Sequence, residues 1–207
     1  MTTTPQSSTV PYIATWSAEQ RLKTTLITDS RGIAELHEGP HSRDSHGVLW
    51  WHRTLHVGRG RPEYGSVHPQ RQQRAMRRLL CQVCAGPADR DERGVLWLLE
   101  EHRNSWATWP SDALTTHPPV CLPCAVEAVR RCPHLASGYT AVRVGESEVF
   151  GVYGMRFRPG RLAPVEVGID VVSYGAPAVR WVVAGQLVRA LDSCTVVDLQ
   201  DELAARP

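Results

Sequence analysis

Four cysteines in two closely spaced pairs are the residues whose types and spacing most clearly predict chemistry in this chain. Cys81 and Cys84 form one Cys-x-x-Cys pair, and Cys121 and Cys124 form a second after the intervening residues 85–120. Two residues between the cysteines let both sulfurs of a tight turn face one ion, and two such turns complete a tetrahedron around zinc. Four unrelated buried thiols are a weaker explanation, because they would not occur in this paired spacing. The sequence therefore predicts a zinc site with these four cysteines as ligands.

Two further cysteines and a histidine could compete for the metal. Cys132 follows Cys124 by about two turns if the run between them is helical, so it cannot join the same tetrahedron without breaking that helix. A ligand set that uses Cys132 or His134 in place of Cys121 is the open alternative. Otherwise we expect Cys132 to be a packed thiol or a helix-end residue, His134 to cap that helix end, and Cys194 to belong to the core.

The order of the segments around the cysteines adds a family resemblance over residues 81–134. A knuckle, "CQVCAGPAD", precedes a predicted hairpin at Asp91, and "CLPCAVEAVRRC" then places the second pair at the start of a helix-forming run. This order resembles the treble-clef family of zinc fingers. The resemblance implies a structural zinc, whose binding contributes roughly 10–16 kcal/mol in such modules. Loss of any one ligand would then unfold this region.

Treble-clef fingers also form the core of the HNH nucleases, to which the chain has a distant and incomplete resemblance. "WLLEEHRN" offers Glu101 and His102 between the two cysteine pairs, and His117 stands near the family's central asparagine or histidine. The resemblance implies that His102 activates water while Glu101 and one more ligand hold a divalent metal. The chain departs from the family in the helix after the second pair, where Glu127 is the one further metal ligand on offer.

A basic segment lies immediately before the first cysteine pair. Residues 53–78 contain a single acid, Glu63, and seven arginines: Arg53, Arg59, Arg61, Arg71, Arg74, Arg77 and Arg78. Within this segment, residues 68–80 are predicted to form a helix, because Pro69 suits the first helical position and apolar residues recur on one side. Another side carries the four candidate nucleic-acid-binding residues, Arg71, Arg74, Arg77 and Arg78. These arginines either contact a phosphate backbone or form a solvated face that pairs with acids elsewhere, such as Asp89, Asp91, Glu92, Glu100 and Glu101.

Three short repeats predict β-hairpin turns and the strands on either side of them. Each repeat reads Asp-x-x-Gly and begins at Asp29, Asp44 or Asp91. An aspartate at the first turn position accepts the N–H two residues on, and glycine at the fourth adopts the left-handed conformation that returns the chain. We expect strands near 24–28, 33–37, 48–52 and 95–99. Trp50 and Trp97 should point inward, whereas Trp106 and Trp109 lie in a Pro/Ser loop that favours exposure.

The C-terminal part has a different pattern. Residues 139–160 predict two strands that turn around Gly145–Ser147, and residues 165–175 predict another strand. Residues 176–194 predict a helix with one apolar face, formed by Val179, Val182, Val183, Leu187, Ala190 and Leu191. A short strand and a fraying tail follow.

These elements indicate an α+β fold in which β-hairpins and helices surround a treble-clef-like four-cysteine zinc site. We expect a disordered tail over residues 1–10, a hairpin-rich region with the zinc finger over 11–136, and an α+β region over 137–207. The last two could also form one continuous domain. Of 207 residues, 42% are hydrophobic and 21% are charged, which is ordinary for a globular protein.

The remaining features narrow the function to three hypotheses. No signal peptide or membrane-spanning run occurs, so we expect a cytoplasmic protein whose six cysteines serve as metal ligands or free thiols. The net charge of +2 is too small to imply nucleic acid as a property of the whole chain. The preferred hypothesis is a structural zinc site that organises a surface for nucleic acid or a protein partner. The alternatives are a divergent HNH-like nuclease, and a pathway accessory protein or enzyme with purely structural zinc; the oligomeric state stays open.

Overall fold

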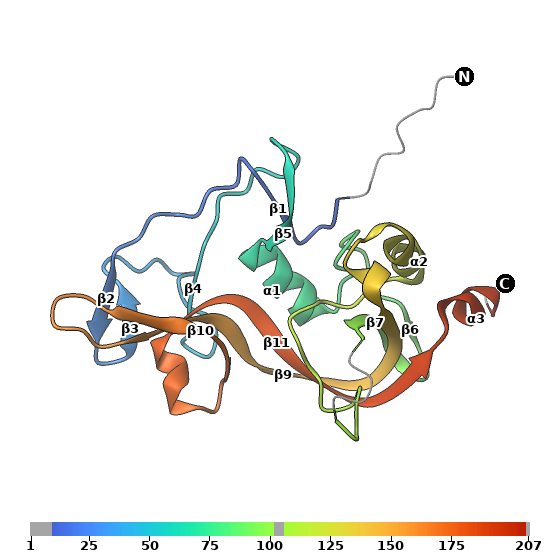
Figure 1. The fold of residues 1–207 in the computed structure, drawn as a ribbon. Helices are drawn as coiled ribbons and strands as arrows, with labels where there is room; N and C mark the ends of the chain where they lie inside the picture. The colour runs from blue at the N-terminus through green and yellow to red at the C-terminus, as the bar shows by residue number, and fades with distance from the viewer. Residues whose placement is uncertain (1–9, 102–105, 206–207) are drawn as a thin grey trace.

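Two long antiparallel strands form the centre of the fold in the computed structural model, which describes residues 10–101 and 106–205. Strand β9 (Tyr139–Arg158) pairs with β11 (Val182–Val197) along most of their length, and two register shifts interrupt the ladder. Figure 1 shows the pair as a long curved ribbon with other elements along its length and at both of its ends. Most other strands of the central sheet pair with one of these two strands.

The ribbon belongs to a sheet of seven strands within the described part of the chain. The order is β4 (Leu49–Trp50), β11, β9, β7 (Gly94–Glu100) and β6 (Arg90–Asp91). In addition, β10 (Val165–Ser173) pairs with β9 and β8 (Leu114–Thr115) pairs with β11. Strands from residues 11–136 and from residues 137–207 therefore share one sheet.

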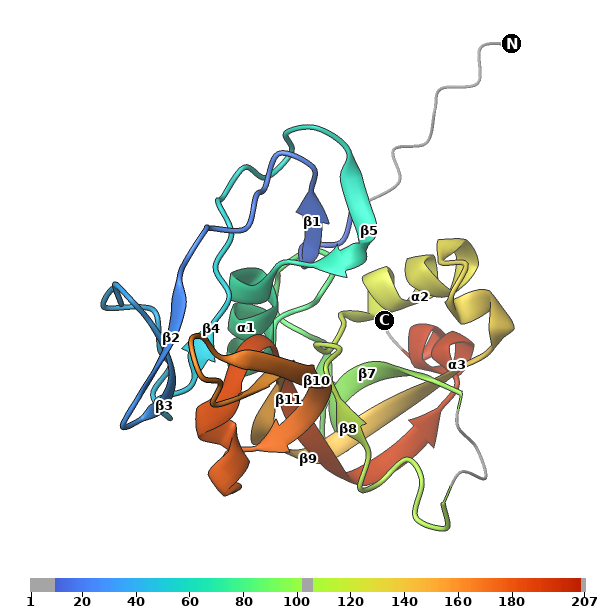
Figure 2. The ribbon, with the colours of Figure 1, turned by 60° about the vertical axis from the view of Figure 1, so that its left-hand side comes forward.

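Helices and two small two-stranded sheets accompany this sheet, so the predicted α+β class is confirmed. Helix α1 (Pro69–Arg78) packs on β11, and α2 (Leu122–Arg131) lies beside α3 (Leu199–Ala204) at one end of the ribbon (Figure 2). Strand β1 (Ala14–Trp16) pairs with β5 (Pro62–Val67), and β2 (Leu26–Asp29) pairs with β3 (Gly32–Glu35). The 3₁₀ turns η1 (Leu135–Ser137) and η2 (Pro177–Trp181) complete the elements. Among the described residues, no helix combines the length and apolar character needed to cross a membrane.

All three Asp-x-x-Gly repeats are turns, as predicted. In each, an aspartate Oδ1 accepts the backbone N–H two residues on, at 2.8 Å for Asp29 and 2.9 Å for Asp44 and Asp91. The glycines have positive φ, at 118° for Gly32, 77° for Gly47 and 120° for Gly94. The first and third repeats join β2 to β3 and β6 to β7.

Two predictions for the C-terminal part are wrong. The first, a turn at Gly145–Ser147, lies inside β9, where Ser147 pairs with Leu191 of β11. On the opposite side of β9, residues 139–144 pair with β7 and residues 151–158 pair with β10. The polar stretch therefore marks the gap between two neighbouring strands and not a reversal of the chain.

The second wrong prediction, a helix over residues 176–194, is replaced by η2 and β11. The middle of β11 is buried on both faces, so its apolar residues do not alternate with polar ones. Register shifts between Ala184 and Gln186 and between Val188 and Arg189 move the pattern further from a period of two. Together these effects imitate helical spacing. The tail beyond is also ordered up to residue 205, because the Asp198 carboxylate caps α3 by accepting the Gln200 and Asp201 N–H groups.

Two core clusters lie on the two faces of β7, and one of them contains residues of both cysteine pairs. Leu96 and Leu98 pack beneath α2, while Trp97 faces the opposite way and is fully buried. Trp50 is 3% exposed, so the inward direction predicted for it and for Trp97 is confirmed. Trp106 is 40% exposed, as its loop position indicates.

The turn glycines provide a matched test of this fold. A Cβ at Gly94 would lie 2.0 Å from the Val144 carbonyl oxygen, whereas nothing lies within 4 Å of one at Gly47. We expect Gly94→Ala to lower the free energy of unfolding by about 3 kcal/mol or more, and Gly47→Ala by about 1 kcal/mol from backbone strain alone. Urea denaturation measures both values. Equal losses would contradict the close approach of the Asp91 turn to β9.

Candidate metal centre and basic surface

The four predicted ligands converge in the structure. Their sulfur atoms all lie within 4.8 Å of one another, and the Cys84 and Cys121 sulfurs are 3.8 Å apart. Zinc–sulfur bonds of about 2.3 Å give a tetrahedron with edges of about 3.8 Å, whereas a disulfide would bring two sulfurs to about 2.05 Å. The geometry therefore fits a metal ion and not a pair of disulfides. No other group of three or more potential His, Cys, Asp or Glu ligands is found among the residues that the structure describes.

The first pair lies in a tight turn that begins where α1 ends. The Cys81 N–H donates to the Gly86 carbonyl at 2.8 Å, and the Ala85 N–H donates to the Cys81 carbonyl at 2.9 Å. The Val83 N–H points at the Cys81 sulfur at 3.4 Å. Backbone donors thus orient a sulfur that carries negative charge when it binds a metal.

The second pair lies at the N-terminus of α2. Cys121 is the N-cap residue with extended backbone, and Cys124 is in the first turn, where the helix dipole favours a thiolate. Leu122, Ala125 and Val126 bury the opposite side of the helix against β7. One backbone hydrogen bond, from the Gln82 N–H to the Pro119 carbonyl at 2.9 Å, links the first pair to the segment that leads into the second.

Crowding of the thiols shifts their acidity. Burial raises the pKa of Cys121 to about 11, and burial together with the neighbouring thiols raises the pKa of Cys124 further. Burial also acts against ionisation of Cys84, but hydrogen bonds from the Gly86 N–H and from the other thiols outweigh it and lower the pKa of Cys84. At neutral pH a cation is therefore needed to hold all four sulfurs as thiolates.

The other sulfurs lie outside this centre. Cys132 is the C-cap of α2, where its N–H donates to the Ala128 carbonyl at 2.8 Å, so the prediction of a helix-end residue is confirmed. His134 precedes η1 and does not cap α2. Cys194 packs in the core beside β7. The structure brings Cys121 together with Cys81, Cys84 and Cys124. The alternative ligand set, with Cys132 or His134 in place of Cys121, is therefore not the one that converges.

Two residues of the nuclease hypothesis, Glu101 and His117, belong to no group of three or more potential metal ligands among the described residues. Glu101 is exposed, and its carboxylate accepts the Thr140 hydroxyl at 2.8 Å. His117 is exposed as a residue, and its carbonyl accepts the Trp97 indole N–H at 2.9 Å. His102 lies outside the described residues. The nuclease hypothesis stays a prediction.

Of the four α1 arginines predicted to contact nucleic acid, Arg71 is not on the surface. It is 4% exposed, and its guanidinium donates to both carboxylate oxygens of Glu19, one of them at 2.6 Å. Burial acts to raise the pKa of Glu19, but hydrogen bonds from Arg71 and from the Trp16 N–H outweigh it and hold that pKa below its usual range. This ion pair joins α1 to the segment after β1. Sequence reasoning missed Glu19 because its partner lies far along the chain.

The remaining three arginines form an exposed surface, the α1 arginine face, consisting of Arg74, Arg77 and Arg78. Arg74 donates to the Tyr12 hydroxyl at 3.2 Å, and Arg77 lies 3.8 Å from the Asp44 carboxylate. Asp44 is already held by stronger contacts, since it accepts the Trp50 indole N–H at 2.9 Å and a tyrosine hydroxyl at 2.6 Å.

The metal centre and the basic surface are physically connected. The Tyr12 N–H donates to the Val83 carbonyl at 2.9 Å and the Ile13 N–H to the Gln82 carbonyl at 3.3 Å, so the knuckle holds the chain that enters β1. From the other side, Arg71 donates to the Ala14 carbonyl at 2.6 Å. The knuckle therefore fixes the N-terminal segment between the metal centre and α1.

Comparison of the chain with models of known families, with curated proteins and with solved structures found no match.

Metal analysis tests the centre directly. We expect about one zinc per chain in the purified protein, since four thiolates complete one tetrahedron. Cys124→Ser should lose the metal, and the region around α2 should unfold. Cys132→Ser should keep the metal and the folded region. Elemental analysis and circular dichroism measure these outcomes. Metal retained in Cys124→Ser, or lost in Cys132→Ser, would contradict the ligand assignment.

The raised pKa values predict how zinc affinity depends on pH. In the metal-free protein the Cys121 and Cys124 thiols keep their protons at neutral pH, so zinc must displace at least those two protons. The apparent affinity should therefore rise by about a hundredfold or more per pH unit between pH 6 and 8. Competition with a chelator of known affinity at several pH values measures this slope. A slope near zero would show that the thiols are already ionised without metal.

Proposed function

We propose that this chain is a zinc-stabilised nucleic-acid-binding protein, in which a treble-clef-like four-cysteine centre holds a basic surface in place. The zinc is structural in this proposal. Four protein ligands occupy the whole tetrahedron, whereas catalytic zinc sites keep one position for water or substrate. The metal's role is then to fix the knuckle and α2, and through the knuckle the segment that leads into β1.

The observation that carries the nucleic-acid part is the pairing of charges around α1. Among the described residues, the exposed Arg74 and Arg78 have no acidic partner. Two of the acids that could have neutralised them are occupied elsewhere, because Asp89 and Asp91 pair with the buried Arg143, at 2.7 and 3.4 Å. The competing explanation, a solvated face paired with these acids, is therefore the weaker one.

Unpaired surface arginines suit a phosphate backbone. Guanidinium groups are weakly hydrated and form two parallel hydrogen bonds with phosphate oxygens. Each neutralised phosphate releases counterions, so binding of this kind weakens as salt increases. A protein partner with an acidic surface would use the same charges, but it would not require the regular spacing of a helix face.

Anisotropy titrations with labelled 20-base-pair DNA at two salt concentrations test this function. We expect salt-dependent binding by the wild-type chain. The double variant Arg74→Gln/Arg78→Gln should bind about tenfold more weakly, and the logarithmic salt slope should become smaller by about 2, or about 1 for each lost phosphate contact. The matched control is Arg158→Gln/Arg161→Gln, which removes the same charge from exposed positions at the far end of β9.

The outcomes separate the hypotheses. Equal losses in both double variants would show that only net charge matters. Absence of salt-dependent binding to DNA and RNA would contradict the proposal. Cleavage of plasmid DNA with Mg²⁺ or Mn²⁺, abolished by His102→Ala, would favour the HNH-like nuclease instead.

A further inference from the structure

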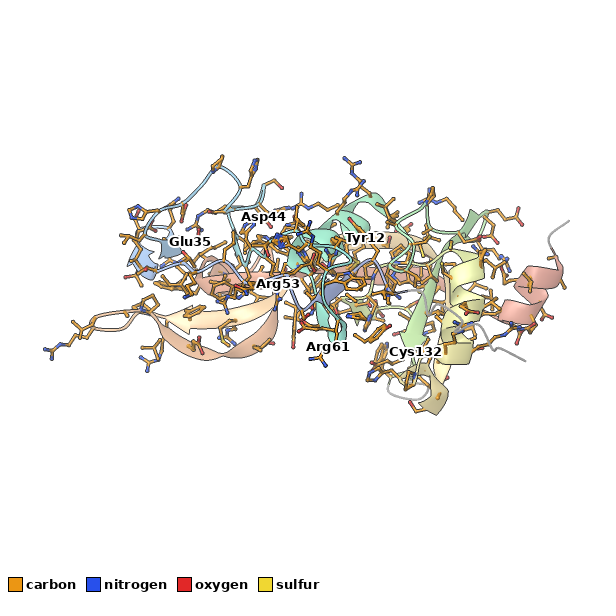
Figure 3. The ribbon with its side chains drawn as sticks, turned by 90° about the horizontal axis from the view of Figure 1, so that it is seen from above. Tyr12, Glu35, Asp44, Arg53, Arg61 and Cys132 are labelled. Carbon is orange, nitrogen blue, oxygen red and sulfur yellow. The ribbon has the colours of Figure 1, made fainter. Side chains whose placement is uncertain are left out.

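An exposed loop before β5 carries two arginines that the α1 arginine face does not include. We define the arginine-glycine tip as residues 55–61, "LHVGRGR", all of which are exposed. Leu55 is 69% exposed and Val57 is 62% exposed, which is unusual for aliphatic side chains of a folded loop. Figure 3 shows Arg61 and Arg53 in the middle part of the molecule.

Hydrogen bonds hold the tip at both of its ends. At the C-terminal end, the Ser17 N–H donates to the Arg61 carbonyl and the Arg61 N–H donates to the Ser17 hydroxyl, both at 2.9 Å. At the N-terminal end, the His56 N–H donates to the Glu19 carboxylate at 3.2 Å. The same short segment, residues 17–19, therefore fixes both ends, and the tip is a supported projection.

Two glycines shape the projection. Gly58 and Gly60 have positive φ, at 77° and 83°, and the Arg59 N–H between them donates to the His56 carbonyl at 3.1 Å. A Cβ at Gly60 would lie 2.2 Å from the Ser17 hydroxyl, so glycine is required for the close approach. The result is a narrow turn with an arginine on either side of a residue without a side chain.

The charges of the tip are not used within the protein. Neither Arg59 nor Arg61 has an acidic partner or a side-chain hydrogen bond in the parts of the chain that the structure describes. Of the nearby acids, Glu19 holds Arg71, while the exposed Glu63 accepts the Thr15 hydroxyl at 3.1 Å and pairs with neither arginine of the tip. Folding thus leaves two solvated guanidinium groups on a backbone that is held at both ends, beside two exposed aliphatic side chains.

This combination matches the minor groove of duplex DNA more closely than it matches the major groove. The minor groove is about 6 Å wide, too narrow for a helix but wide enough for a thin loop. Glycine lets the backbone approach closely, and the weakly hydrated guanidinium loses little when it leaves water. A·T-rich tracts narrow the groove and strengthen its negative potential, which attracts arginine, while apolar side chains can contact the sugar walls and base steps. Double-stranded RNA has a wide, shallow minor groove that offers no such fit.

We propose that the arginine-glycine tip inserts Arg59 and Arg61 into the minor groove of A·T-rich duplex DNA. This inference rests on the proposed nucleic-acid-binding function and adds a preference for base composition to it. The α1 arginine face contacts phosphates in either case. The zinc centre supports the tip indirectly, because the knuckle holds residues 12 and 13, which lead into the segment that fixes both ends of the tip.

The test compares two labelled 20-base-pair duplexes of equal length, one with a central A·T tract and one with a central G·C tract, at one salt concentration. The wild-type protein should bind the A·T duplex about tenfold more tightly. Arg59→Gln/Arg61→Gln should bind both duplexes equally while keeping salt-dependent binding. Arg59→Lys/Arg61→Lys keeps the charge and should lose most of the preference, since ammonium is more strongly hydrated. Arg158→Gln/Arg161→Gln should keep the preference, and netropsin, a minor-groove ligand, should displace the wild-type protein from the A·T duplex.

Each other outcome has a definite meaning. Salt-dependent binding without any A·T preference would overturn the role of the tip and leave the proposed function standing. A preference that persists in Arg59→Gln/Arg61→Gln, with circular dichroism unchanged, or tighter binding to RNA duplex, would also overturn it. Absence of binding to every duplex would overturn both proposals together.

Discussion

The convergence of four cysteine thiols at one point, where a single cation could bind them all, is the constraint on which much of this structure depends. Within 4.8 Å of one another, the sulfurs cannot all ionise at neutral pH unless a metal neutralises them. A metal bound by all four sulfurs would join the knuckle after α1 to the start of α2. Leu96 and Leu98 of β7 pack in the same core cluster as both. The knuckle carbonyls then fix the segment that enters β1. A metal bound by these four sulfurs would therefore tie together several elements that are distant in sequence.

Buried ion pairs join elements that the cysteine cluster does not reach. They also engage acids that could otherwise pair with surface arginines. Arg71 with Glu19 joins α1 to the N-terminal segment, and Arg143 with Asp89 and Glu202 joins β9 to the Asp91 turn region and α3. Removing one member of such a pair leaves a buried charge without compensation, which is why these contacts tie elements together strongly. The acids used in this way are unavailable to the exposed arginines. The basic character of the surface is thus a consequence of how the interior is paired, in a chain whose net charge is only +2.

Much of the local structure, but less of the C-terminal half, could be predicted from the sequence. The three Asp-x-x-Gly turns and the α1 helix depend on hydrogen bonds and caps within a few residues, so their signals are present in short stretches. Strand β11 could not be recognised in this way. It is covered on both faces and interrupted by register shifts, and both effects come from partners such as β9 and α1 that lie elsewhere in the chain. The polar middle of β9 was misleading for the same reason, because it reflects a gap between β7 and β10.

The sequence by itself identified the four cysteines that converge, since two residues between cysteines dictate how the sulfurs of each pair can face one point. It also determined the turns and the mixed α+β class. Only the tertiary structure decided which arginines reach solvent. Arg71 and Arg74 are alike in sequence context, yet one is buried against Glu19 and the other is exposed beside Tyr12. The physical reason is that exposure depends on long-range packing and on the partner that each charge finds, and neither is encoded in the spacing of neighbouring residues.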